Sequence, residues 1–409
     1  MPEIQPFRGV LYRVPGEALS RVLAPPYDVI TPAGQAELYA RDPRNVVRIV
    51  LSREPGEAAY ESAAASYRSL LGDGTLAEDR EPALYLLEQG FEAGGRTLRR
   101  HGLMARFRAE DPERRVVLPH EQTRQGPKED RYRLLKATRA NFSPIFMMFG
   151  DTSGAFRSLA SAVTTAPPLL HYTDDGGVGH RLWRVTEPPR IDGFQKALEE
   201  AQAFIADGHH RYATALRYRD ETGPEGAWTF GYFTPLEDPG LLVLPYHRIL
   251  SAGPSLGEIR SALEGCFRLS EADGPREAAA RAGASAAPHA FGFAEPGGAS
   301  LLAEATPEAL ALMPKDAPAS LRALDTYYLH RVVLGQLLGV AEEAVSYVHS
   351  LAEAVEAVES RACSMAVLMR ATPVSQIVDV ALAGESMPAK STFFHPKLPS
   401  GLVIHPLPE

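Results

Sequence analysis

Lysine is the scarcest charged residue of this chain. Only six of the 42 basic residues are lysines, so arginine supplies nearly all of the positive charge. If a compositional bias has replaced most lysines by arginine, lysine should remain chiefly where a compact, mobile ammonium group is needed. The positions of the remaining lysines therefore point to candidate functional sites. Four of them fall in two short segments, 128–136 and 390–397. Either they cluster by chance or they contact an anionic ligand.

Cysteine pairs, long apolar runs and a net positive charge are also missing. Cys266 and Cys363 are far apart and lie in no CxxC pattern, which argues against a zinc site or a redox pair. No apolar run approaches the ~20 residues of a membrane span. The formal net charge of -9 argues against general binding of nucleic acid. Residues 1–5 show no signal-peptide pattern, so we expect a cytoplasmic protein.

The composition is that of an ordinary globular protein, and 409 residues suffice for two or three domains. Strand and helix patterns are mixed along the chain, which predicts an α+β fold. We expect a mixed-sheet domain over 1–250, a linker at 251–255 and a smaller α/β domain over 256–409. Among the expected elements are strands at 45–52 and 240–250, a hairpin formed by 83–91 and 96–108, a helix over 128–139 and a long helix over 321–338.

The segment 204–212 brings an acid, a glycine, two histidines and an arginine together. Phe204, Ile205 and Ala206 read as the end of a buried strand, and a helix is expected from Arg211 onward. A strand-to-helix turn at Asp207 and Gly208 would direct backbone N–H groups at one point, which suits an anion. Arg211 adds a bidentate donor, and Asp207 is a candidate proton acceptor or Mg²⁺ ligand. The alternative is an aspartate cap, a glycine turn and surface histidines at His209 and His210.

Three further stretches contain candidate site residues. Asp28 follows two prolines and precedes a helix, so it is a rigidly held candidate base or an Asx turn. The polar stretch 118–144 contains Glu121, a second candidate base. It either forms a cationic phosphate site or is a solvated helix. A glycine-led loop near the C-terminus is either a phosphate-binding lid or an ordinary surface loop, because the GxxxxGK frame is absent. The candidate phosphate contacts are the turn residues Gly208, His209, His210 and Arg211 together with Lys128, Arg131, Arg139, Asn141, Lys390, Ser391 and Thr392.

Several motifs resemble those of known families. The sequence Asp-Gly-His-His-Arg at 207–211 resembles the signature of the ParB/sulfiredoxin-like fold, which includes free serine kinases. The chain as a whole resembles the DUF1015 family, whose name records an unknown function. The segments that carry this second resemblance are 25–30 (Pro-Pro-Tyr-Asp-Val-Ile), 118–121 (Leu-Pro-His-Glu), 141–146 (Asn-Phe-Ser-Pro-Ile-Phe) and 390–394 (Lys-Ser-Thr-Phe-Phe).

The resemblance implies an enzyme that handles phosphate on a small hydroxyl substrate. We expect a phosphotransferase similar to the free serine kinases, with Mg²⁺ on Asp207 and with pyrophosphate or a nucleotide as donor. Asp28 or Glu121 would take the proton of the hydroxyl. Two alternatives stay open: a phosphoserine phosphatase that uses the same site, and a ParB-like nucleotide- or DNA-binding regulator. The oligomeric state is not predicted.

Overall fold

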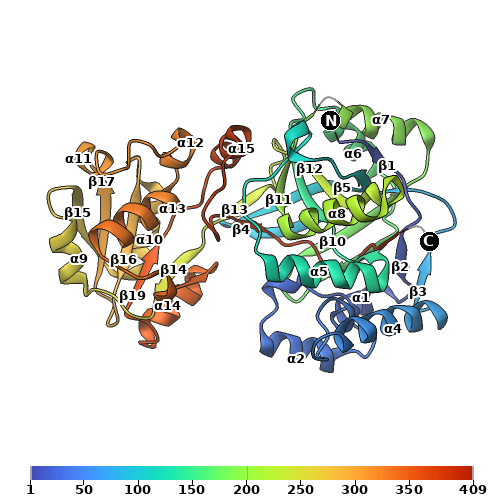
Figure 1. The fold of residues 1–409 in the computed structure, drawn as a ribbon, viewed down its shortest axis with the longest axis horizontal. Helices are drawn as coiled ribbons and strands as arrows, with labels where there is room; N and C mark the ends of the chain where they lie inside the picture. The colour runs from blue at the N-terminus through green and yellow to red at the C-terminus, as the bar shows by residue number, and fades with distance from the viewer. Residues whose placement is uncertain (1, 200, 408–409) are drawn as a thin grey trace. The chain divides into compact units, whose positions relative to one another are not determined.

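The computed structural model describes residues 2–199 and 201–407, and the chain forms two compact units (Figure 1). Unit 1 consists of Met1–Pro119, Thr123–Leu242 and Pro396–Glu409, and unit 2 of His120–Gln122 and Val243–His395. This division differs from the expected one in two respects. The expected linker 251–255 lies inside unit 2, and residues 396–409 belong to unit 1.

Unit 1 is built on a mixed sheet in which parallel and antiparallel neighbours alternate irregularly. The strand order is β6-β11-β8-β12-β5-β4-β10-β9, and β1 also pairs with β5. The strands are β1 Ile4–Gln5, β2 Val10–Tyr12, β3 Leu76–Glu78, β4 Leu84–Ala93, β5 Arg96–Arg108, β6 Val117–Leu118, β7 Ala140–Asn141, β8 Ile145–Phe149, β9 Leu170–Thr173, β10 Gly179–Val185, β11 Ala203–Asp207, β12 Trp228–Pro235 and β21 His405–Pro406. The helices are α1 Leu19–Val22, α2 Pro32–Arg41, α3 Val47–Val50, α4 Ala58–Gly72, α5 Gln125–Thr138, α6 Ala155–Val163, α7 Pro188–Glu199 and α8 His209–Thr222.

The main core of unit 1 lies on one face of this sheet. Ile145, Met147 and Phe149 of β8 belong to one buried cluster with residues of β4, β5 and β11, because alternate side chains of a strand share a face. Phe156 of α6 and Phe194 of α7 pack edge to face in the same cluster. Helix α8 adds further apolar side chains. The helices α6, α7 and α8 therefore cover this face.

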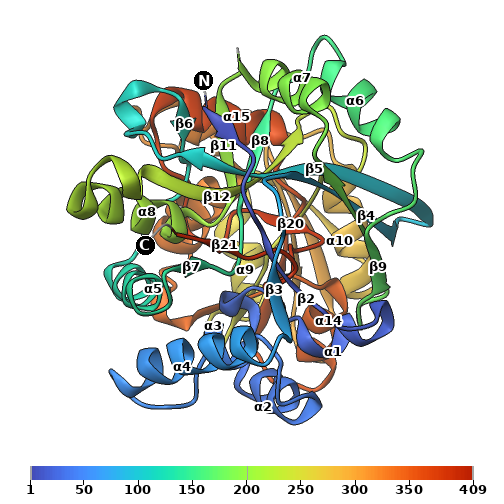
Figure 2. The ribbon, with the colours of Figure 1, turned by 90° about the vertical axis from the view of Figure 1, so that its right-hand side faces the viewer.

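The C-terminal segment of unit 1 packs against β4, β5 and β7. The fully buried guanidinium of Arg100 on β5 donates to the carbonyl of Pro396 at 2.5 Å and also contacts Gln89. Farther along, β21 pairs with β7, as Figure 2 shows. Residues more than 250 positions apart in the sequence thus complete a single unit.

Unit 2 contains a second sheet with the order β15-β17-β16-β19-β14-β18, and its pairs are antiparallel. Together with the mixed sheet of unit 1, this confirms the α+β class. The strands are β14 His247–Leu250, β15 Phe267–Ala272, β16 Ala290–Ala294, β17 Ser300–Ala305, β18 Val345–Val348, β19 Met365–Leu368 and β20 Phe393–His395. The helices are α9 Leu256–Leu263, α10 Gly274–Ala284, α11 Pro307–Leu310, α12 Ala319–Arg322, α13 Asp325–Tyr328, α14 Leu351–Glu359 and α15 Val374–Ala383. β13 (Leu242–Leu244) spans the boundary and pairs with β20.

Three expected elements were wrong. The expected strand 45–52 contains the helical turn α3 instead, in which three of the four residues are buried; the Asn45 side chain accepts from the Val47 N–H at its start. A short run of apolar residues does not distinguish strand from buried helix. The expected helix 321–338 is divided into α12, α13 and a π-helical segment, Leu329–Leu337. The expected strand 240–250 is broken at Pro245 into β13 and β14.

The hairpin and the polar helix were predicted correctly. β4 and β5 pair in register around Gly94 and Gly95, both with positive φ. The helix expected over 128–139 is α5, which begins three residues earlier. In the part of the chain that the structure describes, no helix combines the length and the apolar character that a membrane crossing requires.

Gly102 on β5 provides a test of the packing between β5 and β12. A Cβ at this position would lie 2.1 Å from the buried ring of Tyr232, so Gly102→Ala forces that ring or the strand to move. We expect a loss of about 1–3 kcal/mol in the free energy of unfolding, the usual cost of overpacking. Urea unfolding of the full chain measures it.

Gly90 on the neighbouring strand is the matched control. A Cβ there would meet no atom within 4 Å, so Gly90→Ala should be neutral or slightly stabilising. Equal effects of the two substitutions would contradict the described packing.

Candidate functional site

The strand-to-helix junction predicted at 204–212 is present in unit 1. β11 ends at Asp207, and α8 begins at His209, two residues earlier than expected. Gly208 joins them with φ 98°, a left-handed conformation that favours glycine. A Cβ at Gly208 would also lie 3.0 Å from the guanidinium of Arg211. Backbone geometry and the position of Arg211 therefore both require glycine here.

Asp207 is held between two cations. Its Oδ2 accepts from Arg211 Nη2 at 2.5 Å, and its Oδ1 is contacted by the Nζ of Lys397. Arg211 also donates to the carbonyl of Pro144 at the start of β8. Each of the three charged side chains is only about one-seventh exposed. The cluster Lys397–Asp207–Arg211 thus ties together β11, α8, the approach to β8 and the C-terminal segment.

The electrostatics of Asp207 differ from what the sequence predicted. Burial raises the pKa of this carboxyl, but Lys397 and then Arg211 outweigh burial and hold the pKa well below its usual value. A carboxylate that weakly basic does not suit a general base. Both oxygens of Asp207 contact cations, and the predicted role of this residue as a Mg²⁺ ligand stays a prediction. The described residues include no cluster of three or more His, Cys, Asp or Glu suited to a metal ion.

A small hollow of about 50 Å³ lies beside this cluster. Arg211, Arg131 and Asn141 line it, and all three are predicted phosphate contacts. Tyr27, from the Pro-Pro-Tyr-Asp motif, lies on the same hollow. Its ring stacks under the Arg131 guanidinium at 3.9 Å. Three motifs that are far apart in the sequence therefore meet at one point.

The other predicted contacts on α5 do not form one cationic face. Arg131 donates to Asp130 and to the carbonyl of Val50 while lining the hollow. Arg139 follows the end of α5 with φ 49°, so it leaves the helical surface that Lys128 and Arg131 share. The Asn141 amide contacts His405 at 3.2 Å, which ties it to β21.

His210 and Asp28 lie close to one another at the start of α8. His210 Nε2 accepts from the Arg124 N–H at 3.0 Å, so this nitrogen carries no proton. Burial lowers the pKa of His210, Asp28 opposes that shift, and Lys128 adds to it. Asp28 is exposed in a short 3₁₀ turn, Tyr27–Val29, ahead of α2. Thr31 caps α2 and Pro32 occupies its first position.

The remaining predicted residues, apart from His209, belong to unit 2. Glu121 bridges to Met387. The Lys390 ammonium lies 5.1 Å from the centre of the Tyr246 ring, and the backbone carbonyl of Lys390 accepts from the buried Arg248. Ser391 is buried and bonds to Thr326 and Pro388, while Thr392 is half-buried. The Lys-Ser-Thr segment is therefore integrated in the packing of unit 2. His209 is buried at the first position of α8 in unit 1.

Sequence reasoning missed two residues of the junction. Lys397, which completes the Asp207 cluster, was marked only by the scarcity of lysine. Tyr27 belongs to the Pro-Pro-Tyr-Asp motif, but only its neighbour Asp28 was predicted to be a site residue. No local pattern pairs position 397 with position 207, because that pairing depends on the return of the C-terminal segment.

Comparison with known families places this geometry in context. The model of the DUF1015 family, which is described as a family of proteins of unknown function, matches residues 4–327. The chain belongs to this family. The junction, Asp28 and the hollow lie inside the matched region, whereas Lys390 and Lys397 lie beyond it. No curated protein matches the sequence.

Solved structures give only distant matches. A free serine kinase in complex with AMP is 14% identical, with 68% of this chain and 83% of that chain covered and a TM-score of 0.34. A conserved hypothetical protein from Pyrococcus furiosus is 14% identical, with 70% and 90% covered and a TM-score of 0.34. SbnI with C-terminal truncation from Staphylococcus aureus is 9% identical, with 71% and 84% covered and a TM-score of 0.35. Likeness at this level supports no inference about the site.

The Asp207 cluster predicts a pH-dependent stability. Asp207→Asn leaves Lys397 and Arg211 without their shared carboxylate, which should cost roughly 3–5 kcal/mol near neutral pH. Because folding lowers the pKa of Asp207, the stabilisation is complete above about pH 4 and is lost as pH falls toward the folded value. The difference between wild type and variant should therefore shrink by about 1 kcal/mol per unit below pH 4.

Urea unfolding of both proteins at pH 7, 4 and 3 measures this difference. Asp220→Asn on the exposed side of α8 is the control and should have little effect at each pH. A constant difference between wild type and Asp207→Asn over this range would contradict the lowered pKa.

Proposed function

We propose that unit 1 binds the reacting phosphate of a phosphoryl donor at the hollow and transfers it to a small hydroxyl substrate. The observation that carries this proposal is the convergence of Arg211, Arg131 and Asn141 on one hollow at the start of α8. About 50 Å³ is too small for a nucleotide and suits a single terminal phosphate group. The rest of the donor would lie outside.

Three features of the junction favour an anion. The first N–H groups of α8 have no side-chain cap, because the cap residue is Gly208. The N-terminus of a helix attracts negative charge. Arg211 supplies a guanidinium held in place by Asp207 and Pro144. Asp207 acts here as a positioning residue, and its oxygens stay on Lys397 and Arg211 during the reaction.

Asp28 is the proton acceptor in this proposal. It is exposed beside His210, next to Tyr27 on the hollow, so a hydroxyl bound near the hollow would come within its reach. The Thr31 cap and Pro32 restrict the backbone that follows. Phosphoryl transfer depends chiefly on positioning and charge stabilisation, which two fixed arginines and one carboxylate provide.

The acceptor we propose is free serine. It rests on the resemblance of Asp-Gly-His-His-Arg to the free-serine-kinase branch of the ParB-like fold. The full chain is incubated with serine and with pyrophosphate, ADP or ATP, each with and without Mg²⁺, and phosphoserine is followed by ³¹P NMR. Phosphoserine formed with one donor supports the proposal. Failure with all donors, while ethanolamine and threonine also stay unphosphorylated, would refute it.

Arg211→Ala tests the anion contact. Loss of a charge-assisted hydrogen bond should cost about 1.5–3 kcal/mol, or roughly 10- to 150-fold in the dissociation constant for pyrophosphate. Calorimetric titration measures this constant. Arg217→Ala on the exposed side of α8, where Arg217 pairs with Glu129 and Glu221, should bind within twofold of wild type. Equal affinities of all three proteins would place the anion elsewhere.

Asp28→Asn tests the proton acceptor. We expect kcat to fall by about 10²–10⁴ with little change in KM, since the amide keeps the shape of the side chain and cannot take a proton. Steady-state kinetics with serine and the active donor measure both constants. Glu37→Gln on the exposed surface of α2 is the control. If Glu121→Gln were inactive and Asp28→Asn normal, the role of base would pass to Glu121.

A further inference from the structure

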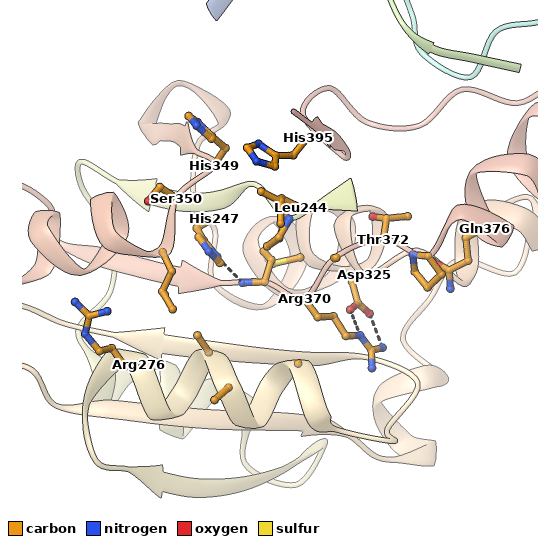
Figure 3. Close-up of a pocket in the computed structure, with 18 residues that line it drawn as sticks. Leu244, His247, Arg276, Asp325, His349, Ser350, Arg370, Thr372, Gln376 and His395 are labelled. Carbon is orange, nitrogen blue, oxygen red and sulfur yellow. Dashed lines mark hydrogen bonds and ion pairs between the residues drawn. The ribbon is translucent and has the colours of Figure 1, made fainter. Parts of the chain in front are cut away.

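Unit 2 contains a much larger cavity than the hollow of unit 1. Its volume is about 1060 Å³, which is at the upper end of the ~300–1,000 Å³ typical of small-molecule sites. Residues of β13, β14, α10, α14 and α15 line it, together with those that follow β19 (Figure 3). None of these residues takes part in the proposed phosphoryl transfer.

One part of the lining is apolar. Leu244, Met369 and Leu351 present aliphatic side chains, and Ala279 and Ala280 of α10 leave room beside them. Met369 is almost fully buried, so this wall is part of the packed interior rather than a shallow depression of the surface. An apolar wall of this kind contributes affinity through the area that a ligand buries on it.

His247 offers a buried hydrogen-bond donor to the cavity. The side chain is 3% exposed, and its Nδ1 accepts from the Met369 N–H at 3.1 Å. The proton of the neutral ring therefore sits on Nε2, for which the described residues supply no partner. Burial, followed by the nearby Arg248, lowers the pKa of His247 to about 4, so the ring is a neutral donor at pH 7.

The charged residues on the lining favour an anion. Asp325 is the one acid among the described lining residues, and Arg370 neutralises it through hydrogen bonds of 2.5 and 3.1 Å. His289 contacts the same carboxylate at 2.8 Å. Arg276 lines the cavity from an exposed position on α10, and no carboxylate of the described residues pairs with it. The formal charge of these groups is therefore positive.

Two helices begin at the cavity. Ser350 and Leu351 at the start of α14 line it, as do Pro373 and Gln376 at the start of α15. Pro373 occupies the cap position of α15 and provides no side-chain hydrogen bond to its first N–H groups. Figure 3 shows Ser350, at the start of α14, on the side of His247 and Gln376 of α15 on the opposite side, so the N-terminus of α14 adds partial positive charge near His247.

We propose that unit 2 binds a small organic anion in this cavity, a carboxylate or a phosphate ester whose apolar body lies on the wall formed by Leu244, Leu351 and Met369. The anionic group would face His247 and the N-terminus of α14, on the side of the cavity where Arg276 also lies. This site is separate from the phosphate hollow of unit 1, and its occupant need not be a substrate of the proposed transfer.

Calorimetric titration of the full chain with phenyl phosphate, benzoate and inorganic phosphate tests the site. We expect phenyl phosphate or benzoate to bind at least tenfold more tightly than inorganic phosphate, because only these probes carry an apolar ring. The tighter of the two identifies the anion as phosphate ester or carboxylate. No binding of either aromatic probe would overturn the proposal.

Two variants locate the bound probe. Arg276→Gln removes the unpaired cation and should weaken binding about 10- to 100-fold. Ala280→Trp fills the cavity from an exposed position on α10 and should abolish binding. Arg331→Gln, an exposed cation of unit 2 that does not line the cavity, is the matched control and should change the affinity less than twofold. Unchanged affinity in Ala280→Trp would overturn the proposal.

Discussion

The contact of one carboxylate with two cations organises unit 1. Asp207 ends a central strand, Arg211 lies in the first turn of the next helix, and Lys397 comes from the C-terminal segment. A carboxylate that is largely buried needs such partners, because desolvation alone would make its charged form unfavourable. The contact of Asp207 with Arg211, together with that of Arg211 with the Pro144 carbonyl, fixes the guanidinium that we assign to phosphate binding. Stability and the proposed function therefore depend on one cluster.

The return of the chain to unit 1 follows from this constraint. Lys397 reaches Asp207 because Arg100 binds the preceding carbonyl, that of Pro396, from a fully buried position. Beyond Lys397, His405 contacts Asn141 where β21 pairs with β7. Burial, together with the nearby Arg106, lowers the pKa of His405 to about 3, so this histidine is a neutral part of the interior. The last residues are thus a structural component of the proposed site.

Local signals were enough to predict the junction but not its partners. The apolar run before Asp207, the glycine and the helix pattern after it predicted strand, turn and helix correctly, since each depends on neighbours in sequence. Asp207 and Lys397 are 190 residues apart in the sequence, and no periodic pattern of the sequence indicates that they come into contact. The role of Asp207 as a metal ligand was predicted from its residue type alone, without knowledge that both of its oxygens contact cations.

The same limit explains the errors in the fold. The run Val46–Val50 is apolar except for the half-buried Arg48, and it forms the helical turn α3, next to which the Asn45 side chain accepts a hydrogen bond from the Val47 N–H. The cavity of unit 2 left little trace in the sequence because its residues come from six separate segments. The place of His247 on the cavity depends on the strands and helices around it.

The central claim is that Arg211, positioned by Asp207, binds phosphate at the hollow of unit 1. A crystal structure of the full chain with pyrophosphate tests it most directly. The account predicts phosphate oxygens about 2.7–3.0 Å from the Arg211 guanidinium and near the first N–H groups of α8, with the contacts from Asp207 to Lys397 and Arg211 retained. Pyrophosphate bound away from the hollow, or bound there with Asp207 released from both cations, would contradict it.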